Sequence, residues 1–179
     1  MSVQLEISSE EIAKKVKELG NDISADYPDL TGDDPLVVIS VLKGSFIFTA
    51  DLIREIDLPV VVDFIGLQSY GDSTKSSGIV KITQDLSTQI TGKHVLIVED
   101  IVDTGLTLNY LTTILQARNP ASIKVCTLLY KKSKSLSKKE PDYVAFVVDD
   151  LFFIGYGLDS KQVSRNLRGI WKLDETSDI

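Results

Sequence analysis

The feature that most constrains the fold is the alternation of short apolar runs with amphipathic stretches along the 179-residue chain. Short runs rich in Val and Ile are typical of strands, whereas apolar residues three or four positions apart are typical of helices. We predict strands over residues 36–41, 60–67, 79–85, 94–99, 122–130 and 143–148. We predict helices over residues 45–56 and about 106–118, and a first helix that is capped by Ser8 and Glu11 and ends before Pro28. This alternation predicts an α/β domain with a mainly parallel, twisted sheet flanked by helices.

Length and composition predict one ordinary globular domain over residues 1–179. Hydrophobic residues make up 43% of the chain and charged residues 25%, which is typical of a folded domain and not of a disordered or collagen-like chain. The formal net charge is −7. This charge disfavours a nonspecific nucleic-acid binder, because such proteins bind mainly by neutralising phosphates. It is compatible with a locally positive site for a small phosphorylated ligand.

The sequence carries no recognisable signal for export or membrane insertion. The first residues, MSVQLEISSEE, lack the basic start and apolar centre of a signal peptide. No apolar run approaches the roughly 18 residues of a membrane span. We therefore expect a cytoplasmic protein that binds neither membranes nor nucleic acid. The one cysteine, Cys126, is expected to be a buried core thiol, and the one histidine, His94, to have a structural role.

Several common catalytic and ligand-binding motifs are absent from the sequence. There is no G-x-x-x-x-G-K-[ST] phosphate loop and no G-x-S-x-G nucleophile elbow. Gly155 and Gly157 form a G-x-G, but the third glycine of a dinucleotide fingerprint does not follow. A single histidine excludes a His-rich zinc site. The chemistry must therefore come from another motif.

The strongest candidate is the segment VLIVEDIVDTGLT, residues 95–107, in which a predicted strand runs through an acidic pair into a predicted helix. In open α/β sheets, ligands bind where strand carboxyl ends meet helix amino ends. The free N–H groups and dipole of such a helix end suit a phosphate, and Gly105 permits its close approach. Glu99 and Asp100 precede the turn and suit sugar hydroxyls or Mg²⁺. On spacing alone, an ordinary helix cap made by the acidic and threonine residues is an equally good interpretation.

This segment closely resembles the phosphoribosyl-pyrophosphate motif of the phosphoribosyltransferase family, in which hydrophobic residues and an acidic pair precede D-T-G-x-T. The wider chain is similar to the hypoxanthine-guanine branch of that family. The other matching segments are L-K-G at 42–44, Ser69 with Tyr70, L-L-Y-K at 128–131 and DLFFIGYGLD at 150–159. The resemblance extends from about residue 7 to residue 171, which is almost the whole chain.

The resemblance implies the type I phosphoribosyltransferase fold, with a small hood formed by the terminal segments. A mobile active-site loop is implied over about residues 69–78, opened by Ser69 and Tyr70. The implied reaction transfers a phosphoribosyl group from phosphoribosyl pyrophosphate to hypoxanthine or guanine, giving IMP or GMP and pyrophosphate. Mg²⁺ is the implied cofactor, because it neutralises a departing pyrophosphate. A homodimer or homotetramer is the assembly that the resemblance suggests.

The resemblance also assigns roles toward phosphoribosyl pyrophosphate. Asp103 is the implied general base or acid at N7 of the purine. Lys43, preceded by a non-proline cis peptide, and Arg165 would approach the pyrophosphate. The implied binding residues are Lys43, Gly44, Glu99, Asp100, Asp103, Thr104, Gly105, Leu106, Thr107 and Arg165, with Glu99, Asp100 and Asp159 as the metal ligands.

For the purine, the implied residues are Lys131, Phe152, Phe153 and Asp159. The ammonium of Lys131 can only donate hydrogen bonds, so it suits a 6-oxo group and not the 6-amino group of adenine. Phe152 would stack on the base, and the backbone of Phe153 would meet its edge, while the bulk of the Phe153 side chain is a candidate influence on access to the purine 2-position. We expect the lysines that follow to form a solvated charged loop: Lys132, Lys134, Lys138 and Lys139.

Two alternatives stay open at this point. One is a phosphoribosyltransferase for another base, such as xanthine or a pyrimidine. The other is a regulator that kept the phosphoribosyl-pyrophosphate site but binds RNA or DNA. The net charge of −7 and the lack of an added DNA-binding domain count against the regulator.

Overall fold

The computed structural model of the protein describes residues 3–69, 80–136 and 140–173. The loop expected over residues 69–78 lies outside the described residues, apart from Ser69 at its start. Among the described residues, no helix combines the length and the apolarity that crossing a membrane requires.

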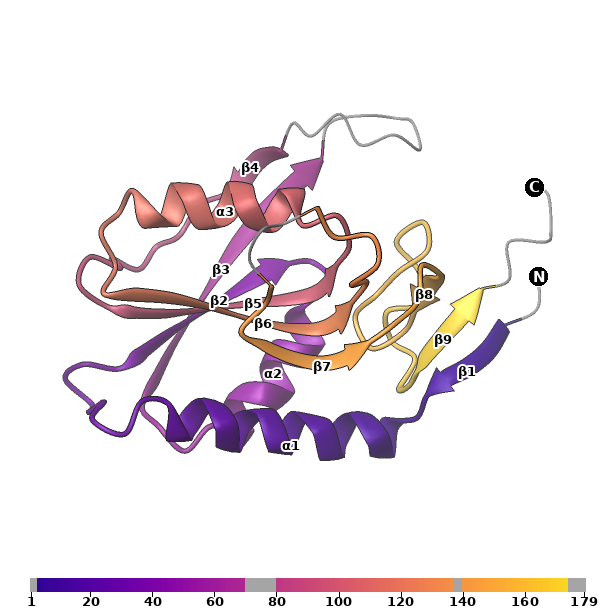
Figure 1. Cartoon of the computed structure of the whole chain (residues 1–179), viewed down its shortest axis with the longest axis horizontal. Coiled ribbons are helices and arrows are strands. Elements are labelled where there is room, and N and C mark those ends of the chain that lie inside the picture. Colours follow the sequence, from indigo (N-terminus) through magenta and orange to yellow (C-terminus); the bar gives the residue numbers. More distant parts are fainter. Residues whose placement is uncertain (1–2, 70–79, 137–139, 174–179) are drawn as a thin grey trace.

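The main layer is a six-stranded sheet with the strand order β4-β3-β2-β5-β6-β7 (Figure 1). Its strands are β2 (Leu36–Leu42), β3 (Val60–Ser69), β4 (Val80–Gln84), β5 (His94–Val102), β6 (Ser122–Tyr130) and β7 (Tyr143–Val147). All neighbouring strands are parallel except β3 and β4, which are antiparallel. The prediction of a mainly parallel sheet is therefore confirmed.

Helices cover both faces of this sheet (Figure 1). The helices α1 (Ser9–Ala25) and α2 (Phe46–Glu55) lie on one face, and α3 (Leu106–Gln116) lies on the other. Successive side chains of a strand point to opposite faces, so Leu96 packs with α1 and α2 while Val95 and Ile97 pack with α3. This explains why the central strands are apolar on both sides and lack polar alternation.

A second, three-stranded antiparallel sheet brings the two ends of the chain together. Its order is β1-β9-β8, with β1 (Val3–Ile7), β8 (Phe152–Ile154) and β9 (Ile170–Leu173). In Figure 1 this sheet stands beside the ends of β5, β6 and β7. The hood expected from the terminal segments is therefore confirmed, although neither β1 nor the strands near the carboxyl end were predicted as strands.

The smaller structural predictions are also confirmed. Ser8 and Glu11 form a capping box, in which the Ser8 hydroxyl accepts from the Glu11 N–H at 3.2 Å and the Glu11 carboxylate accepts from the Ser8 N–H at 2.9 Å. Cys126 is fully buried, and this burial raises the pKa of its thiol. His94 lies 2.7 Å from the Ser122 hydroxyl and packs edge-on against Tyr27.

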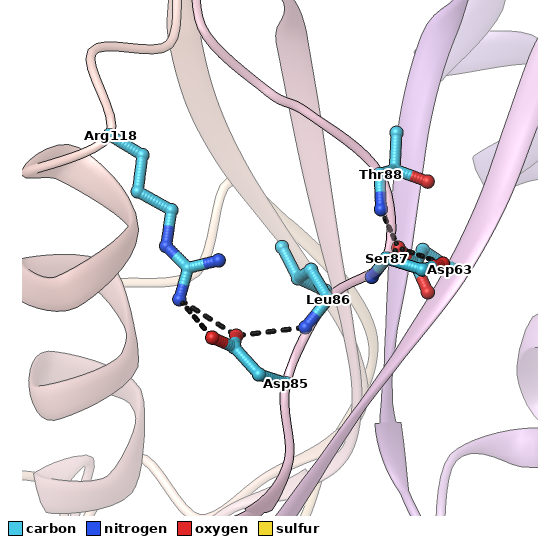
Figure 2. Close-up of polar contacts among 6 residues, drawn as sticks. All are labelled: Asp63, Asp85, Leu86, Ser87, Thr88 and Arg118. Atoms are coloured by element: carbon cyan, nitrogen blue, oxygen red, sulfur yellow. Dashed lines mark hydrogen bonds and ion pairs between the residues drawn. The ribbon is translucent and has the colours of Figure 1, made fainter.

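The edge strand β4 is followed by a segment that two carboxylates hold in place (Figure 2). Asp63 on β3 is buried and accepts hydrogen bonds from the backbone N–H groups of Phe64, Ser87 and Thr88 at 2.7, 2.8 and 2.7 Å. Asp85 accepts from the guanidinium of Arg118, just beyond α3, at 2.7 and 2.9 Å. The chain leaving β4 is thus tied both to β3 and to the end of α3.

Candidate active site

The junction of β5 and α3 forms the centre of the site. The strand carries Glu99 and Asp100 to the edge of the sheet, and the turn at residues 103–105 then leads into the helix. Gly105 is the residue before the first turn of α3 and has a φ of 78°, a left-handed conformation that disfavours other residues. The first N–H groups of a helix have no partners inside it. This end of α3 is therefore suited to an anion, as the sequence predicted.

The two members of the acidic pair differ in their surroundings, because Asp100 accepts a hydrogen bond from the Ile101 N–H at 2.9 Å while Glu99 is buried with one oxygen unpaired among the described residues. Glu99 is only 9% exposed, and within the described part of the chain its Oε2 has no hydrogen-bond partner. Burial, together with the neighbouring Asp100, raises the pKa of Glu99 well above its ordinary value. Burial also raises the pKa of Asp100, to about 6. The buried carboxylate of Glu99 and the partly buried one of Asp100 are oxygen ligands that a divalent cation would stabilise.

Asp159, which was predicted to help hold the metal, is paired with an arginine in the structure. In residues 3–69, 80–136 and 140–173 there is no group of three or more His, Cys, Asp and Glu side chains that could hold a metal ion. Asp159 instead accepts from the guanidinium of Arg165 at 2.6 Å. The donor set still fits Mg²⁺, because this ion is commonly held by one or two carboxylates together with substrate phosphates. The metal role of Asp159 stays a prediction.

The turn after β2 packs against this centre. The peptide between Leu42 and Lys43 is cis, as the family resemblance implied. Gly44 lies directly beneath the carboxylate of Asp100, with no room for a side chain. On its other side, a Cβ on Gly157 would lie 2.0 Å from the carbonyl oxygen of Gly44. The Lys43 turn is therefore held between the acidic pair and the segment that follows β8.

Two cations line one cavity next to this turn. The cavity has a volume of about 470 Å³ and is lined by Leu42, Lys43, Gly66, Leu67, Gln68, Thr83, Gln84, Gln162 and Arg165. The amide oxygen of Gln162 lies 3.4 Å from both Lys43 Nζ and Arg165 Nη2, so it accepts from both. Arg165 also donates to the Gly157 carbonyl at 2.7 Å. The structure thus brings together the two cations predicted to bind pyrophosphate, and adds Gln162, which no motif had indicated.

The predicted purine residues lie at the ends of the next two strands and in the hood. Lys131 follows β6, is 7% exposed, and donates to Asp150 at 2.8 Å. Phe152 is 44% exposed and is therefore free of the core. Phe153 points the other way and is buried in the core with residues of α1 and α2. Any effect of its bulk on base access would thus be indirect.

The lysines after Lys131 behave differently from one another. Lys132 forms an exposed ion pair with Glu140 at 2.9 Å, as expected for a solvated loop. Lys134 is exposed as well, as expected, but its ammonium also lies 3.4 Å from Asp103 Oδ2 and 3.1 Å from Asp150 Oδ1, contacts that the sequence did not predict. Ser69 is the last residue of β3, and Tyr70, Lys138 and Lys139 lie outside the described residues.

Comparison with known proteins finds relatives over most of the chain. Residues 4–161 match the model of the phosphoribosyl transferase domain family. The chain is 50% identical over 161 residues to the hypoxanthine-guanine phosphoribosyltransferase of Bacillus subtilis, covering 90% of this chain and 87% of that protein. It is 43% identical to the hypoxanthine-guanine phosphoribosyltransferase of Dictyostelium discoideum, covering 98% of this chain and 97% of that one.

Solved structures show the same likeness. The hypoxanthine phosphoribosyltransferase of Trypanosoma cruzi, in complex with its product IMP, superposes with a TM-score of 0.90 at 45% identity, covering 96% of this chain and 94% of the other. The enzyme of Staphylococcus aureus superposes with a TM-score of 0.89 at 40% identity, covering 96% of this chain and 91% of the other.

Proposed function

This chain belongs to the phosphoribosyltransferase family, and from that premise we propose that it is a purine salvage enzyme. It transfers the 5-phosphoribosyl group of phosphoribosyl pyrophosphate to hypoxanthine or guanine, forming IMP or GMP and releasing pyrophosphate. The observation that carries the proposal is the junction of β5 and α3, where a helix end suited to an anion follows an acidic pair whose first member, Glu99, is buried with no hydrogen-bond partner for its Oε2 among the described residues. Neither an ordinary helix cap nor a core position accounts for that combination.

We propose that the helix end binds the 5′-phosphate. The N–H groups at residues 104–107 and the hydroxyls of Thr104 and Thr107 supply the donors. Lys43 and Arg165 face the cavity of about 470 Å³ and are suited to the two phosphates of the leaving pyrophosphate. The site can thereby hold a substrate that carries phosphate at both ends of its ribose.

Mg²⁺ fits the same arrangement through Glu99 and Asp100. When bound, the ion would neutralise charge that develops on the departing pyrophosphate. The two carboxylates would also face the ribose hydroxyls, from which they can accept hydrogen bonds. Because these carboxylates are shielded from solvent, their attraction to a bound cation is stronger than it would be in water.

On the base side, we propose that Lys131 donates to the purine 6-oxygen and that Phe152 stacks on the ring. A buried ammonium left facing the amino group of adenine would lose a hydrogen bond, which costs about 1–3 kcal/mol. Asp103 acts as general base or acid at N7: as N9 of the purine bonds to the ribose and pyrophosphate leaves, the base must lose its one imidazole proton, which Asp103 accepts from N7 and returns there in the reverse reaction. These roles favour a 6-oxopurine over a pyrimidine.

The test is a spectrophotometric transfer assay with Mg²⁺ and phosphoribosyl pyrophosphate. Hypoxanthine, guanine, xanthine and adenine are offered separately, and nucleotide formation is followed in the ultraviolet. Transfer to hypoxanthine or guanine, with adenine inert, is the expected result. Transfer to xanthine alone would show that xanthine, and not hypoxanthine or guanine, is the substrate. If no base were converted, the proposed transferase function would be wrong.

We also expect a homodimer or homotetramer, to be checked by the molar mass in solution. A nucleic-acid-binding regulator is tested by filter binding to RNA and DNA at low salt. Tight, salt-dependent binding together with absent transfer would favour that alternative.

A further inference from the structure

Three turns meet on the base side of the site, and each follows a different strand. Asp103 lies beyond β5, Lys134 lies beyond β6, and Asp150 lies beyond β7. These strands are neighbours in the sheet and run parallel, so their carboxyl ends are side by side (Figure 1). A side chain from the middle turn can therefore contact both of the others.

Lys134 makes both contacts. Its ammonium lies 3.1 Å from Asp150 Oδ1 and 3.4 Å from Asp103 Oδ2. The same Oδ1 of Asp150 accepts from Lys131 at 2.8 Å. One carboxylate oxygen thus joins two ammonium groups, and through Lys134 the chain of contacts continues to Asp103. The hydrogen bond with Asp150 and the charge of Asp103 raise the pKa of Lys134, so it stays protonated.

The chemistry of a 6-oxopurine makes this linkage useful. The N7 and O6 atoms of such a base lie on one edge of the ring, next to each other. A group that serves N7 and a donor that serves O6 must therefore be held at a fixed separation. In the proposed function these two groups are Asp103 and Lys131, which come from different turns.

We propose that Lys134 is a positioning residue that fixes the carboxylate of Asp103 relative to the ammonium of Lys131. This inference rests on the proposed function, because it assumes that both groups face the same base. Lys134 acts through Asp103 and Asp150 and does not itself contact the purine. Without the Lys134 ammonium, the carboxylates of Asp103 and Asp150 lose the cation that they share. The separation between the Asp103 carboxylate and the Lys131 ammonium, which has to match N7 and O6, is then no longer fixed.

The backbone around Lys134 is held independently of its side chain. The N–H of Lys131 donates to the Val102 carbonyl at 2.9 Å, and the N–H of Leu136 donates to the Thr104 carbonyl at 2.9 Å. A substitution at position 134 therefore leaves the turn attached to the residues that precede α3. Its effect should be confined to the ion pairs.

The experiment compares Lys134→Met, Lys134→Arg and the matched control Lys132→Met. The control removes a lysine of the same turn, whose only ion pair in the described residues is the exposed one with Glu140. Steady-state constants are measured separately for the base and for phosphoribosyl pyrophosphate. Circular dichroism and thermal unfolding confirm that each variant is folded.

For Lys134→Met we expect kcat/KM for the base to fall roughly tenfold, which corresponds to about 1.4 kcal/mol and is within what two partly exposed ion pairs can contribute. The KM for phosphoribosyl pyrophosphate should change less than about twofold, because the helix end is not touched. Lys134→Arg should restore most of the loss, and Lys132→Met should match the wild type.

Equal kinetics for Lys134→Met and the wild type would overturn the inference, as would an equal loss in Lys132→Met. A loss confined to phosphoribosyl-pyrophosphate binding would overturn it too. All of these outcomes presuppose an active wild type. An inactive wild type would instead count against the proposed function, so the two failures are distinguishable.

Discussion

A Cβ atom built on Gly44 would lie 1.5 Å from Oδ2 of Asp100 and 2.4 Å from its Cγ. Such contacts are far inside van der Waals distance, so the carboxylate occupies the space that any side chain at position 44 would need. The relationship joins two segments that are distant in the sequence, the turn after β2 and the acidic pair of β5. It gives a physical reason why residue 44, directly after Lys43, is a glycine.

The first prediction is that Gly44→Ala folds but loses affinity for phosphoribosyl pyrophosphate. The added methyl group must displace the Asp100 carboxylate or the Lys43 turn, a strain of about 1–3 kcal/mol. We expect the KM for phosphoribosyl pyrophosphate to rise roughly 10- to 100-fold, with thermal unfolding showing a native-like transition. Gly32→Ala is the control, because a Cβ there meets no atom within 4 Å. Unchanged kinetics in Gly44→Ala would mean that the position of Asp100 is unimportant.

The second prediction concerns Asp103→Asn. An amide cannot exchange the proton at N7, so kcat should fall by roughly 10²–10⁴-fold, which is the usual contribution of a general acid or base. Binding of phosphoribosyl pyrophosphate, measured by calorimetry with Mg²⁺, should stay within about threefold of the wild type. A mutant with wild-type turnover would exclude Asp103 from the chemistry.

The third prediction is a loss of base selectivity in Lys131→Gln. The glutamine amide can accept as well as donate, so it no longer distinguishes a 6-oxo from a 6-amino group. We expect kcat/KM for hypoxanthine to fall roughly 10- to 100-fold, in line with the loss of a charged hydrogen bond. Adenine, tested in the same assay, should become a measurable substrate. If the mutant kept the wild-type preference, another residue would have to read the 6-position.

The central sheet and the β5–α3 site were predictable because their signals are local in sequence. Apolar runs of strand length are followed by helical spacing, and the acidic pair with D-T-G-x-T occupies one continuous segment. The carboxyl ends of parallel strands lie at one edge, so the position of a motif along its strand also gives its place in the fold.

The hood strands and the partners of Lys134 and Gln162 were not predictable in the same way. β8 and β9 have three and four residues, and the intervening segment contains four non-glycine residues with positive φ: Tyr156, Lys161, Gln162 and Ser164. Strands of three and four residues are too short to show a clear alternation of apolar and polar side chains. Positive φ values at non-glycine residues cannot be read reliably from the residue type. Lys134 contacts turns that follow other strands, a relationship that no spacing along the chain encodes.

The fourth prediction concerns the stability of the β3–β4 edge. Burial tends to raise the pKa of Asp63, but the N–H groups of Thr88, Phe64 and Ser87 outweigh it and hold that pKa below its ordinary value. A carboxylate with a lowered pKa stabilises the fold above its unfolded pKa of about 3.9, and this contribution is lost as the pH falls.

Asp63→Asn should therefore lower the free energy of unfolding at pH 7 by about 1–3 kcal/mol, because the amide satisfies these donors less well. Chemical denaturation should show the difference shrinking toward pH 3.5. The exposed Asp29→Asn serves as the control. A deficit of equal size at both pH values would show that the charge of Asp63 plays no part.

The fifth prediction has the opposite sign and concerns Asp100 in the metal-free protein. Burial raises its folded pKa to about 6, above an unfolded value of about 3.9. The folded state therefore holds the proton more tightly, and the stability that this provides is lost as the pH rises through about 6.

Asp100→Asn should accordingly be more stable than the wild type at pH 7.5, by about 1–3 kcal/mol, while its Mg²⁺-dependent transfer is strongly reduced. Denaturation in the presence of a chelator should show this advantage at pH 7.5 and little of it near pH 4.5. Two results would contradict this prediction: an asparagine variant that is less stable than the wild type at pH 7.5, or a gain in stability that does not change with pH. Either would mean that the ionised Asp100 carboxylate does not destabilise the metal-free protein.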